Sequence, residues 1–228
     1  MSVTPHWDQG RSLVRNANPT GTKNDDSQCQ TAASEPERLR DAVARFDAEN
    51  AKDPTQEIVD GVLCPRELIY AKRLSGWVLT LCPDASEELR LAARCQHLCR
   101  WTIPRQSYPM TRAGYLRWRN DLKAFHARKA GGILRDVRYP EEIIARVQDL
   151  NLKKNFPGDP DSSVLEDALC LVFLQYQFAE LARKTADEKM IDVLRKSWKK
   201  MTPQARAYAL KFSYGEKEQS LIQRALGK

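Results

Sequence analysis

The sequence predicts an all-α fold, and two observations carry that prediction. After residue 36, nearly every apolar pattern repeats at spacings of three and four, which is the period of a helix buried on one face. No run alternates polar and apolar residues over the length that a sheet requires. Because 42% of the 228 residues are hydrophobic, the chain can fill the core of an ordinary domain. We therefore expect one compact multi-helix domain over residues 36–228.

Proline and capping signals divide the first part of this domain into three helices. Pro36 begins the first helix, and the Asp53-Pro54 step ends it. Pro65 begins the second, whose apolar residues keep the helical spacing. Asp84 begins an Asp-x-x-Glu sequence, which predicts a capping box at the start of a third helix.

Two breaks separate the later helices. Two prolines predict a loop over residues 102–111, and the turn-rich stretch NFPGDPDS predicts another over residues 155–162. Between them we expect two helices, of which the second begins after Pro140. The stretch Leu165–Phe178 is apolar on nearly all sides, which indicates a central buried helix. Three shorter helices are expected after it.

Residues 1–35 differ from the rest of the chain. They are rich in small polar residues and poor in large apolar ones, so they predict a disordered tail. Asp8 and Arg11 interrupt the apolar core that a secretory signal would need. No stretch approaches the roughly 20 apolar residues of a membrane span. We expect a cytoplasmic protein that does not enter the membrane.

The basic excess of the chain is local. Residues 94–129 carry nine Lys or Arg residues against one acid, Asp121, a net charge of +8, whereas the whole chain carries +7. Aromatic residues are interleaved with these basic residues. A local positive field with aromatic faces is typical of sites for phosphate-bearing ligands, either a small molecule or RNA.

Arginine is the residue from which we expect the phosphate contacts, because its planar fork matches two phosphate oxygens at once. The predicted phosphate-binding residues are Arg94, Arg100, Arg105, Arg112 and Arg119, with aromatic contacts from Tyr70, Trp101 and Tyr108. The alternative is that these arginines form a solvated helix face and that the aromatic residues belong to the core.

Two histidines and a carboxylate pair lie on three different predicted helices. If they converge, they could hold a divalent Mn, Fe or Mg ion that activates water. The predicted catalytic residues are His97, His126, Glu166 and Asp167, with His97, His126 and Asp167 as metal ligands. Each also has a structural explanation. Ser163 and Glu166 form a capping box, Asp167 suits a first helical turn, and such histidines are often partly buried structural residues.

The order of these residues resembles that of the HD-domain phosphohydrolases, an all-α superfamily of metal enzymes. AARCQH occupies the place of the family's His-Asp dyad, with Gln96 and His97 in its two positions. Tyr70, in LIYAKR, stands where the family's early His would be. The resemblance implies hydrolysis of a phosphate ester or nucleotide by a metal set that has been rebuilt or lost.

From residue 36 onward, the chain also resembles an uncharacterised domain family of bacteria and fungi, whose members are often labelled glutamyl-tRNA synthetase. The matching stretches are RFDAEN, ELIYAKR, LRLAARCQHLCRWTIPR, SYPMTRAGYLRWR, FHA, LEDALCLVFL and KSWKKM. Arg138, Ser163 and Gln175 depart from the family pattern. The label implies an association with tRNA.

Aminoacylation is not expected, because a class I synthetase needs a nucleotide-binding α/β core. The chain has no HIGH-like motif and no glycine-rich phosphate loop, and KMTP at residues 200–203 matches only the start of a KMSKS-like motif. Two functions therefore stay open: a metal-dependent phosphohydrolase acting on a nucleotide or phosphate ester, and a non-catalytic module that binds RNA or tRNA.

Overall fold

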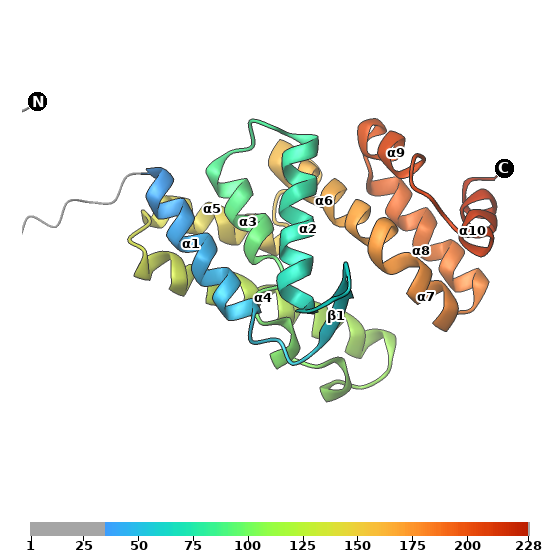
Figure 1. The fold of residues 1–228 in the computed structure, drawn as a ribbon, viewed down its shortest axis with the longest axis horizontal. Coiled ribbons are helices and arrows are strands. Elements are labelled where there is room, and N and C mark those ends of the chain that lie inside the picture. Colours follow the sequence, from blue (N-terminus) through green and yellow to red (C-terminus); the bar gives the residue numbers. More distant parts are fainter. Residues whose placement is uncertain (1–34, 228) are drawn as a thin grey trace, which may run out of the picture. The chain divides into compact units, whose positions relative to one another are not determined.

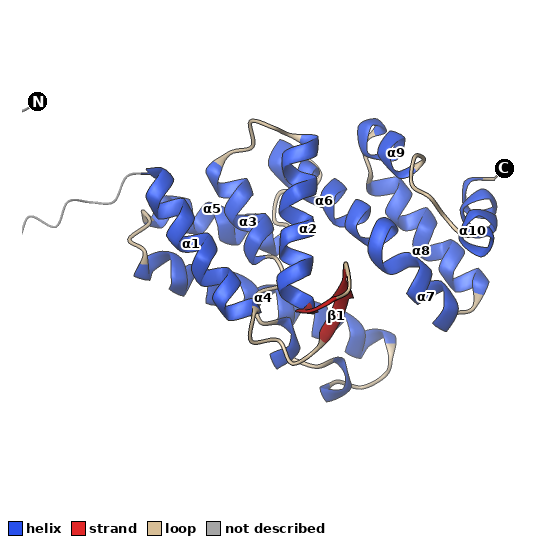
Figure 2. Ribbon diagram, viewed as in Figure 1, coloured by secondary structure: helices blue, strands red, loops and turns tan. Residues whose placement is uncertain are grey.

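The computed structural model describes residues 35–227, and within them the fold is all-α, as predicted. Figures 1 and 2 show the helices and one short hairpin. The elements are α1 (Glu35–Asn50), β1 (Gln56–Val59), β2 (Val62–Pro65), α2 (Arg66–Leu81), α3 (Glu87–Cys95), α4 (Arg112–Asp136), α5 (Glu141–Leu152), α6 (Pro160–Val172), α7 (Phe178–Lys184), α8 (Asp187–Lys200), α9 (Pro203–Ala209) and α10 (Glu216–Leu226). The tail predicted for residues 1–35 lies, except for Glu35, outside the described residues.

The hairpin of β1 and β2 was not predicted, although the sequence contains a recognisable turn signal for it. Asp60 and Gly61 connect the strands with φ angles of 50° and 81°. Two successive residues with positive φ make the turn that suits the twist of a two-residue hairpin, and Asp-Gly is a preferred pair there. The strands pair antiparallel from Gln56 opposite Pro65 to Val59 opposite Val62. They are too short to show a convincing alternation.

Two helix starts differ from the prediction. Ser86, and not Asp84, caps α3, because its hydroxyl accepts a hydrogen bond from the backbone N–H of Leu89 at 3.2 Å. The cap of α6 is Asp159, whose carboxylate accepts from the backbone N–H of Asp161. Helix α6 therefore begins inside the predicted loop, and the predicted Ser163–Glu166 capping box is absent.

The predicted apolar helix Leu165–Phe178 is interrupted. Helix α6 ends at Val172, residues Phe173–Gln177 form one π-helical turn, and α7 continues from Phe178. The side chains of Phe46, Leu74, Leu91 and Leu171 are fully buried in the core around α6. A π-helical turn shifts the register of the side chains that follow it, and such turns are frequent at functional sites.

Helices α2 and α6 pack against each other and lie between the other helices of the domain (Figure 1). Figure 1 shows α1, α3 and α5 on one side of this pair and α7 to α10 on the other. Helix α4, the longest, packs along α5, and α8 packs against α10. The ends of α3, α5 and α8 and the middle of α4 are thereby brought to one region beside α6.

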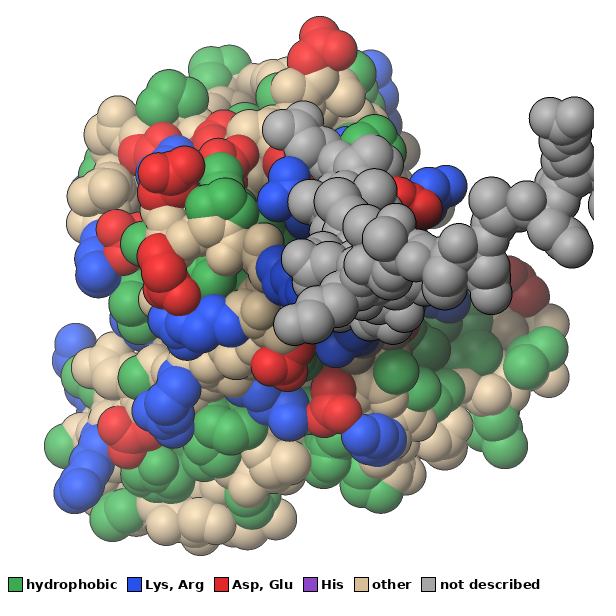
Figure 3. Space-filling model, turned by 90° about the vertical axis from the view of Figure 1, so that its left-hand side faces the viewer, with side chains coloured by type: hydrophobic (Ala, Val, Ile, Leu, Met, Phe, Trp, Pro, Cys, Tyr) green, Lys and Arg blue, Asp and Glu red, His purple; other side chains and the backbone are tan. Residues whose placement is uncertain are grey.

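Two surface properties bear on function. No helix within residues 35–227 is long and apolar enough to cross a membrane. On the face drawn in Figure 3, basic and acidic side chains lie next to one another, as on an ordinary solvated surface. This face therefore shows no excess of positive charge, whereas one cavity does.

Candidate functional site

A cavity of about 450 Å³ lies beside α6, between the middle of α4 and the ends of α3, α5 and α8. This volume falls within the range of about 300–1,000 Å³ that is usual for small-molecule sites. Five cationic side chains line the cavity, against the single carboxylate of Glu166. These cations are Arg100, Arg119, Lys123, Lys153 and Lys200. Both predicted histidines, His97 and His126, also line it.

His97 lies just after α3, and its ring is held on two sides. Its Nδ1 is 3.2 Å from Oε2 of Glu67, and its ring stacks on Tyr70 with centroids 4.0 Å apart and planes 8° from parallel. Burial, and after it the positive charges of Arg100 and Arg119, lower the pKa of His97 well below its ordinary value. The imidazole is therefore neutral at physiological pH.

His126, on α4, is fixed in one tautomer. Its Nδ1 donates a hydrogen bond to the carbonyl oxygen of Leu98 at 2.8 Å, so Nε2 keeps its lone pair. Nε2 is buried and has no hydrogen-bond partner within residues 35–227. Burial, and after it the neighbouring His97 at 5.9 Å between ring centroids, lower the pKa of His126 to about 3.

Glu67, at the start of α2, connects His97 to Arg100. Its Oε1 lies 3.7 Å from Nε of Arg100, and the guanidinium of Arg100 sits 4.8 Å from the ring centroid of Trp118. Burial raises the pKa of Glu67 to about 7, although Arg100 acts in the opposite direction. Glu67 can therefore gain or lose a proton at physiological pH, beside a histidine that stays neutral.

Glu166 is paired twice. Its carboxylate accepts from Nζ of Lys153 and, at 2.8 Å, from Nζ of Lys200. Burial alone would raise the pKa of Glu166, but the two ammonium groups outweigh it and hold the pKa below its ordinary value. Lys153 follows α5 in the left-handed region, with φ of 59°. Helices commonly end in this conformation, and the backbone N–H of Lys153 accordingly donates to the carbonyl of Leu150 at 3.1 Å.

Two further cations of the cavity have no acidic partner. Within residues 35–227, neither Arg119 nor Lys123 makes an ion pair with a carboxylate. Arg119 donates to the hydroxyl of Tyr115 and lies over its ring face, one turn earlier on α4. Their positive charges are therefore available to an anionic ligand.

The other predicted phosphate-binding and aromatic residues lie outside the cavity lining. Arg94 forms a bidentate ion pair with Asp47 at 2.7 and 2.6 Å. Arg105 donates to three backbone carbonyls of its own loop, and Arg112 is exposed at the start of α4. Trp101 packs against the core, and Tyr108 donates to Asp121. Of the predicted set, Arg100, Arg119 and Tyr70 line the cavity.

The two predicted carboxylates point to different places. Asp167 is buried and accepts hydrogen bonds from the backbone N–H and the hydroxyl of Thr202, at 2.8 and 2.5 Å. It thereby fixes the start of α9, because the hydroxyl of Thr202 also caps that helix. Only Glu166 reaches the cavity, where it faces the two lysines.

The predicted metal set is therefore not assembled. Within residues 35–227, no group of three or more His, Cys, Asp or Glu side chains is placed to hold a metal ion. His97 and His126 share the cavity, but the carboxylate of Asp167, predicted to join them, is hydrogen-bonded to Thr202 instead. The five surrounding cations would also repel a divalent ion. The residues present do not fit a resident Mn, Fe or Mg ion.

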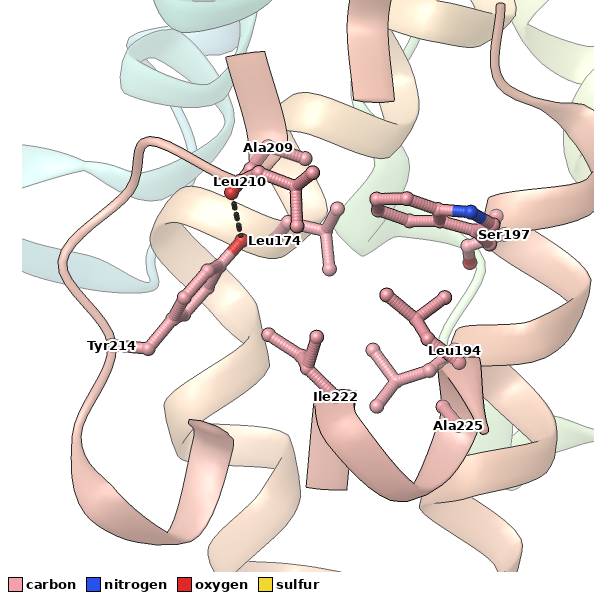
Figure 4. Close-up of a pocket in the computed structure, with 10 residues that line it drawn as sticks. Leu174, Leu194, Ser197, Ala209, Leu210, Tyr214, Ile222 and Ala225 are labelled. Carbon is pink, nitrogen blue, oxygen red and sulfur yellow. Dashed lines mark hydrogen bonds between the residues drawn. The ribbon is translucent and has the colours of Figure 1, made fainter. Parts of the chain in front are cut away.

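A second cavity, among α8, α9 and α10, is apolar and small. Figure 4 shows Leu174, Leu194 and Ile222 pointing into it, with the hydroxyl of Tyr214 turned aside to the carbonyl of Ala209. Its volume of about 20 Å³ is near the minimum for one water molecule. We regard it as a packing defect of the C-terminal helices and not as a ligand site.

Sequence reasoning missed Glu67, Lys123, Lys153 and Lys200. Lys123 lies inside the basic stretch 94–129, one helical turn from Arg119 and close to His126 in sequence, so helix-face spacing could have found it. Lys200 lies in KSWKKM, one of the stretches that carry the family resemblance. Glu67 likewise lies in such a stretch, ELIYAKR, whereas Lys153 left no comparable signal, because the tertiary fold alone brings it to the cavity.

Comparison with known proteins gives a family and nothing further. Residues 40–222 match the sequence profile of a family described as a domain of unknown function, DUF4202. No curated protein and no solved structure matches the chain. The match confirms the resemblance to an uncharacterised domain family. It does not extend to the HD-domain phosphohydrolases or to the glutamyl-tRNA synthetase label.

Proposed function

The chain belongs to the DUF4202 family, and we propose that it binds a phosphomonoester in the cavity beside α6 and hydrolyses it. One observation carries the proposal: five cationic side chains converge on one concave volume that contains a single carboxylate. A dianionic phosphate is the common biological group that this charge distribution would attract most strongly.

The surplus of charge remains after every ion pair has been counted. Glu166 can neutralise only one of its two lysine partners, and Glu67 lies opposite Arg100. Arg119, Lys123 and one lysine are then left to bind an anion. Positive charges held together in a partly buried site repel one another, so a bound phosphate would also stabilise the fold.

A small ligand suits the cavity better than RNA does. RNA would be expected to follow an extended basic surface, whereas the unpaired cations here face a concave pocket of small-molecule size together with two neutral imidazoles. Basic residues on the outside of α4, such as Arg112 and Arg128, are exposed and would serve an RNA-binding module instead.

Titration calorimetry with p-nitrophenyl phosphate and with inorganic phosphate tests this proposal. Arg119→Gln and Lys123→Gln should each weaken binding about tenfold, the usual size for a lost charge-assisted contact. Arg128→Gln removes the same charge from the exposed face of the same helix and should leave the affinity unchanged. Release of p-nitrophenol by the parent protein tests hydrolysis.

Two results would contradict the proposal. One is a parent protein that binds neither ligand at low salt. The other is an Arg128→Gln variant that loses as much affinity as Arg119→Gln. If the parent instead bound RNA with an affinity that grows with RNA length, and Arg112→Gln and Arg128→Gln abolished that binding, the RNA-binding module would replace the hydrolase.

A further inference from the structure

This inference rests on the proposed function and concerns the chemistry of the same cavity. We propose that His97 is the nucleophile of the reaction, and that its Nε2 forms a covalent bond to the phosphorus of the substrate. The protein would then work through a phosphohistidine intermediate and not through direct attack by water.

The orientation of the ring supports this role. Glu67 occupies Nδ1 of His97, and Tyr70 covers one ring face, so Nε2 is the nitrogen left for a ligand. The side chain of His97 is 23% exposed and lines the cavity. His126 is only 2% exposed, and its Nε2 is buried. Of the two imidazoles, His97 is the one that a phosphorus atom can approach.

The charges around His97 also suit a nucleophile. Its imidazole is neutral and therefore keeps a lone pair for attack. Arg100, Arg119 and Lys153 are near enough to lower its pKa, and they can hold the oxygens of a phosphoryl group next to the ring. When the N–P bond forms, the ring becomes positively charged, and the carboxylate of Glu67 lies at Nδ1 to stabilise it.

The first half of the reaction balances as follows. The Nε2 lone pair attacks phosphorus, the ester P–O bond breaks, and its electron pair leaves with the alcohol oxygen. That oxygen takes a proton from the ammonium of Lys153, whose pKa is lowered by burial. The products are an alcohol, a phosphorylated imidazolium that keeps its Nδ1–H toward Glu67, and a neutral lysine.

Water completes the cycle. Its oxygen attacks phosphorus, its proton passes to the neutral amine of Lys153, and the N–P electron pair returns to Nε2. Inorganic phosphate leaves, and both His97 and Lys153 are restored. Each half-reaction conserves charge and needs no metal or redox partner.

Rapid quenching of the protein with p-nitrophenyl phosphate tests the inference. We expect the intact protein to gain the mass of one phosphoryl group, through a linkage that survives alkali and is lost in acid, as a phosphoramidate is. His97→Asn should abolish the labelling while still binding inorganic phosphate. The exposed Arg128→Gln variant should label like the parent.

A substrate made chiral at phosphorus gives a second, independent readout. Two successive displacements at phosphorus retain its configuration, whereas a single attack by water inverts it. Inversion, or hydrolysis by the parent without any labelling, would overturn the inference and leave the proposed function standing. A parent that binds phosphate esters without hydrolysing or labelling would overturn it as well. If the parent bound no phosphate ester at all, both proposals would fail together.

Discussion

Nδ1 of His97 and Oε2 of Glu67 lie 3.2 Å apart, and this pair joins a neutral histidine to a carboxyl group that titrates near neutrality. When Glu67 is ionised, it accepts the Nδ1–H of His97, and Nε2 carries a lone pair. When Glu67 is protonated, it donates to Nδ1, and the histidine proton moves to Nε2. The protonation state of Glu67 therefore decides whether His97 can act as a nucleophile.

The first prediction is a pH profile. The pKa of Glu67 is raised to about 7 by burial, against the opposing charges of Arg100 and Arg66. The turnover of p-nitrophenyl phosphate should accordingly rise as the pH increases through about 7. In Glu67→Gln the amide oxygen can accept the Nδ1–H at every pH, so this inflection should disappear even though the rate falls. An unchanged inflection in the variant would assign it to another group.

The second prediction concerns stability and His126. Its pKa is lowered from 6.5 to about 3, so between these values the unfolded chain binds a proton that the native chain does not. The free energy of unfolding must then fall as the pH is lowered from 6.5, by about 1.4 kcal/mol per pH unit for one such group. Urea unfolding between pH 4 and 7 should show a shallower dependence in His126→Asn. The comparison with the parent matters because Glu67 contributes with the opposite sign over part of this range.

The third prediction separates structure from catalysis at Asp167. Asp167→Ala leaves the backbone N–H of Thr202 without its partner at the partly buried start of α9, which should cost about 1–3 kcal/mol of unfolding free energy. Phosphate binding should not change, because Asp167 does not line the cavity. Asp192→Asn changes an exposed carboxylate of α8, so it is the control and should be near neutral. If Asp167→Ala lost phosphate binding without losing stability, the structural role would be contradicted and Asp167 would belong to the binding site.

The fourth prediction tests the close packing of the loop before α4 against the first turn of that helix. A Cβ on Gly114 would overlap the backbone oxygen of Pro109, whereas a Cβ on Gly132 of the same helix meets nothing within 4 Å. Gly114→Ala should therefore destabilise the protein by lifting the loop from α4. Gly132→Ala should stabilise it by about 0.5–1 kcal/mol, since alanine restricts the unfolded chain and favours the helix. Thermal unfolding of the two variants checks both signs.

The sequence predicted the fold better than the site because helices are local. Three-four spacing and proline signals were enough to find the helices, whereas the small hairpin at Asp60-Gly61, the π-helical turn after Val172 and the capping residues of α3 and α6 were missed. The interruption at Phe173 could not be read from composition, since an apolar run looks the same with or without one inserted residue.

The site depended on which side chains the fold brings together. His97 and His126 were predicted to meet, and both line the cavity. The neighbouring acids Glu166 and Asp167 were predicted to join them, but their side chains point in different directions, as successive residues on a helix do. Arg94 is ion-paired with Asp47, and Arg105 donates to backbone carbonyls of its loop. A count of charges in the sequence does not show which arginines are paired in this way. Lys153 and Lys200 lie 47 residues apart in the chain, at the ends of two helices. The fold brings both of them to Glu166, and so into one cavity.

A crystal structure of the protein with inorganic phosphate, the expected product, tests the central claim most directly. The account predicts one phosphate in the cavity beside α6, within hydrogen-bond distance of Arg100, Arg119 and Lys153 and facing Nε2 of His97. A phosphate bound only to the exposed side of α4, near Arg112 or Arg128, with the cavity empty at saturating phosphate, would contradict it.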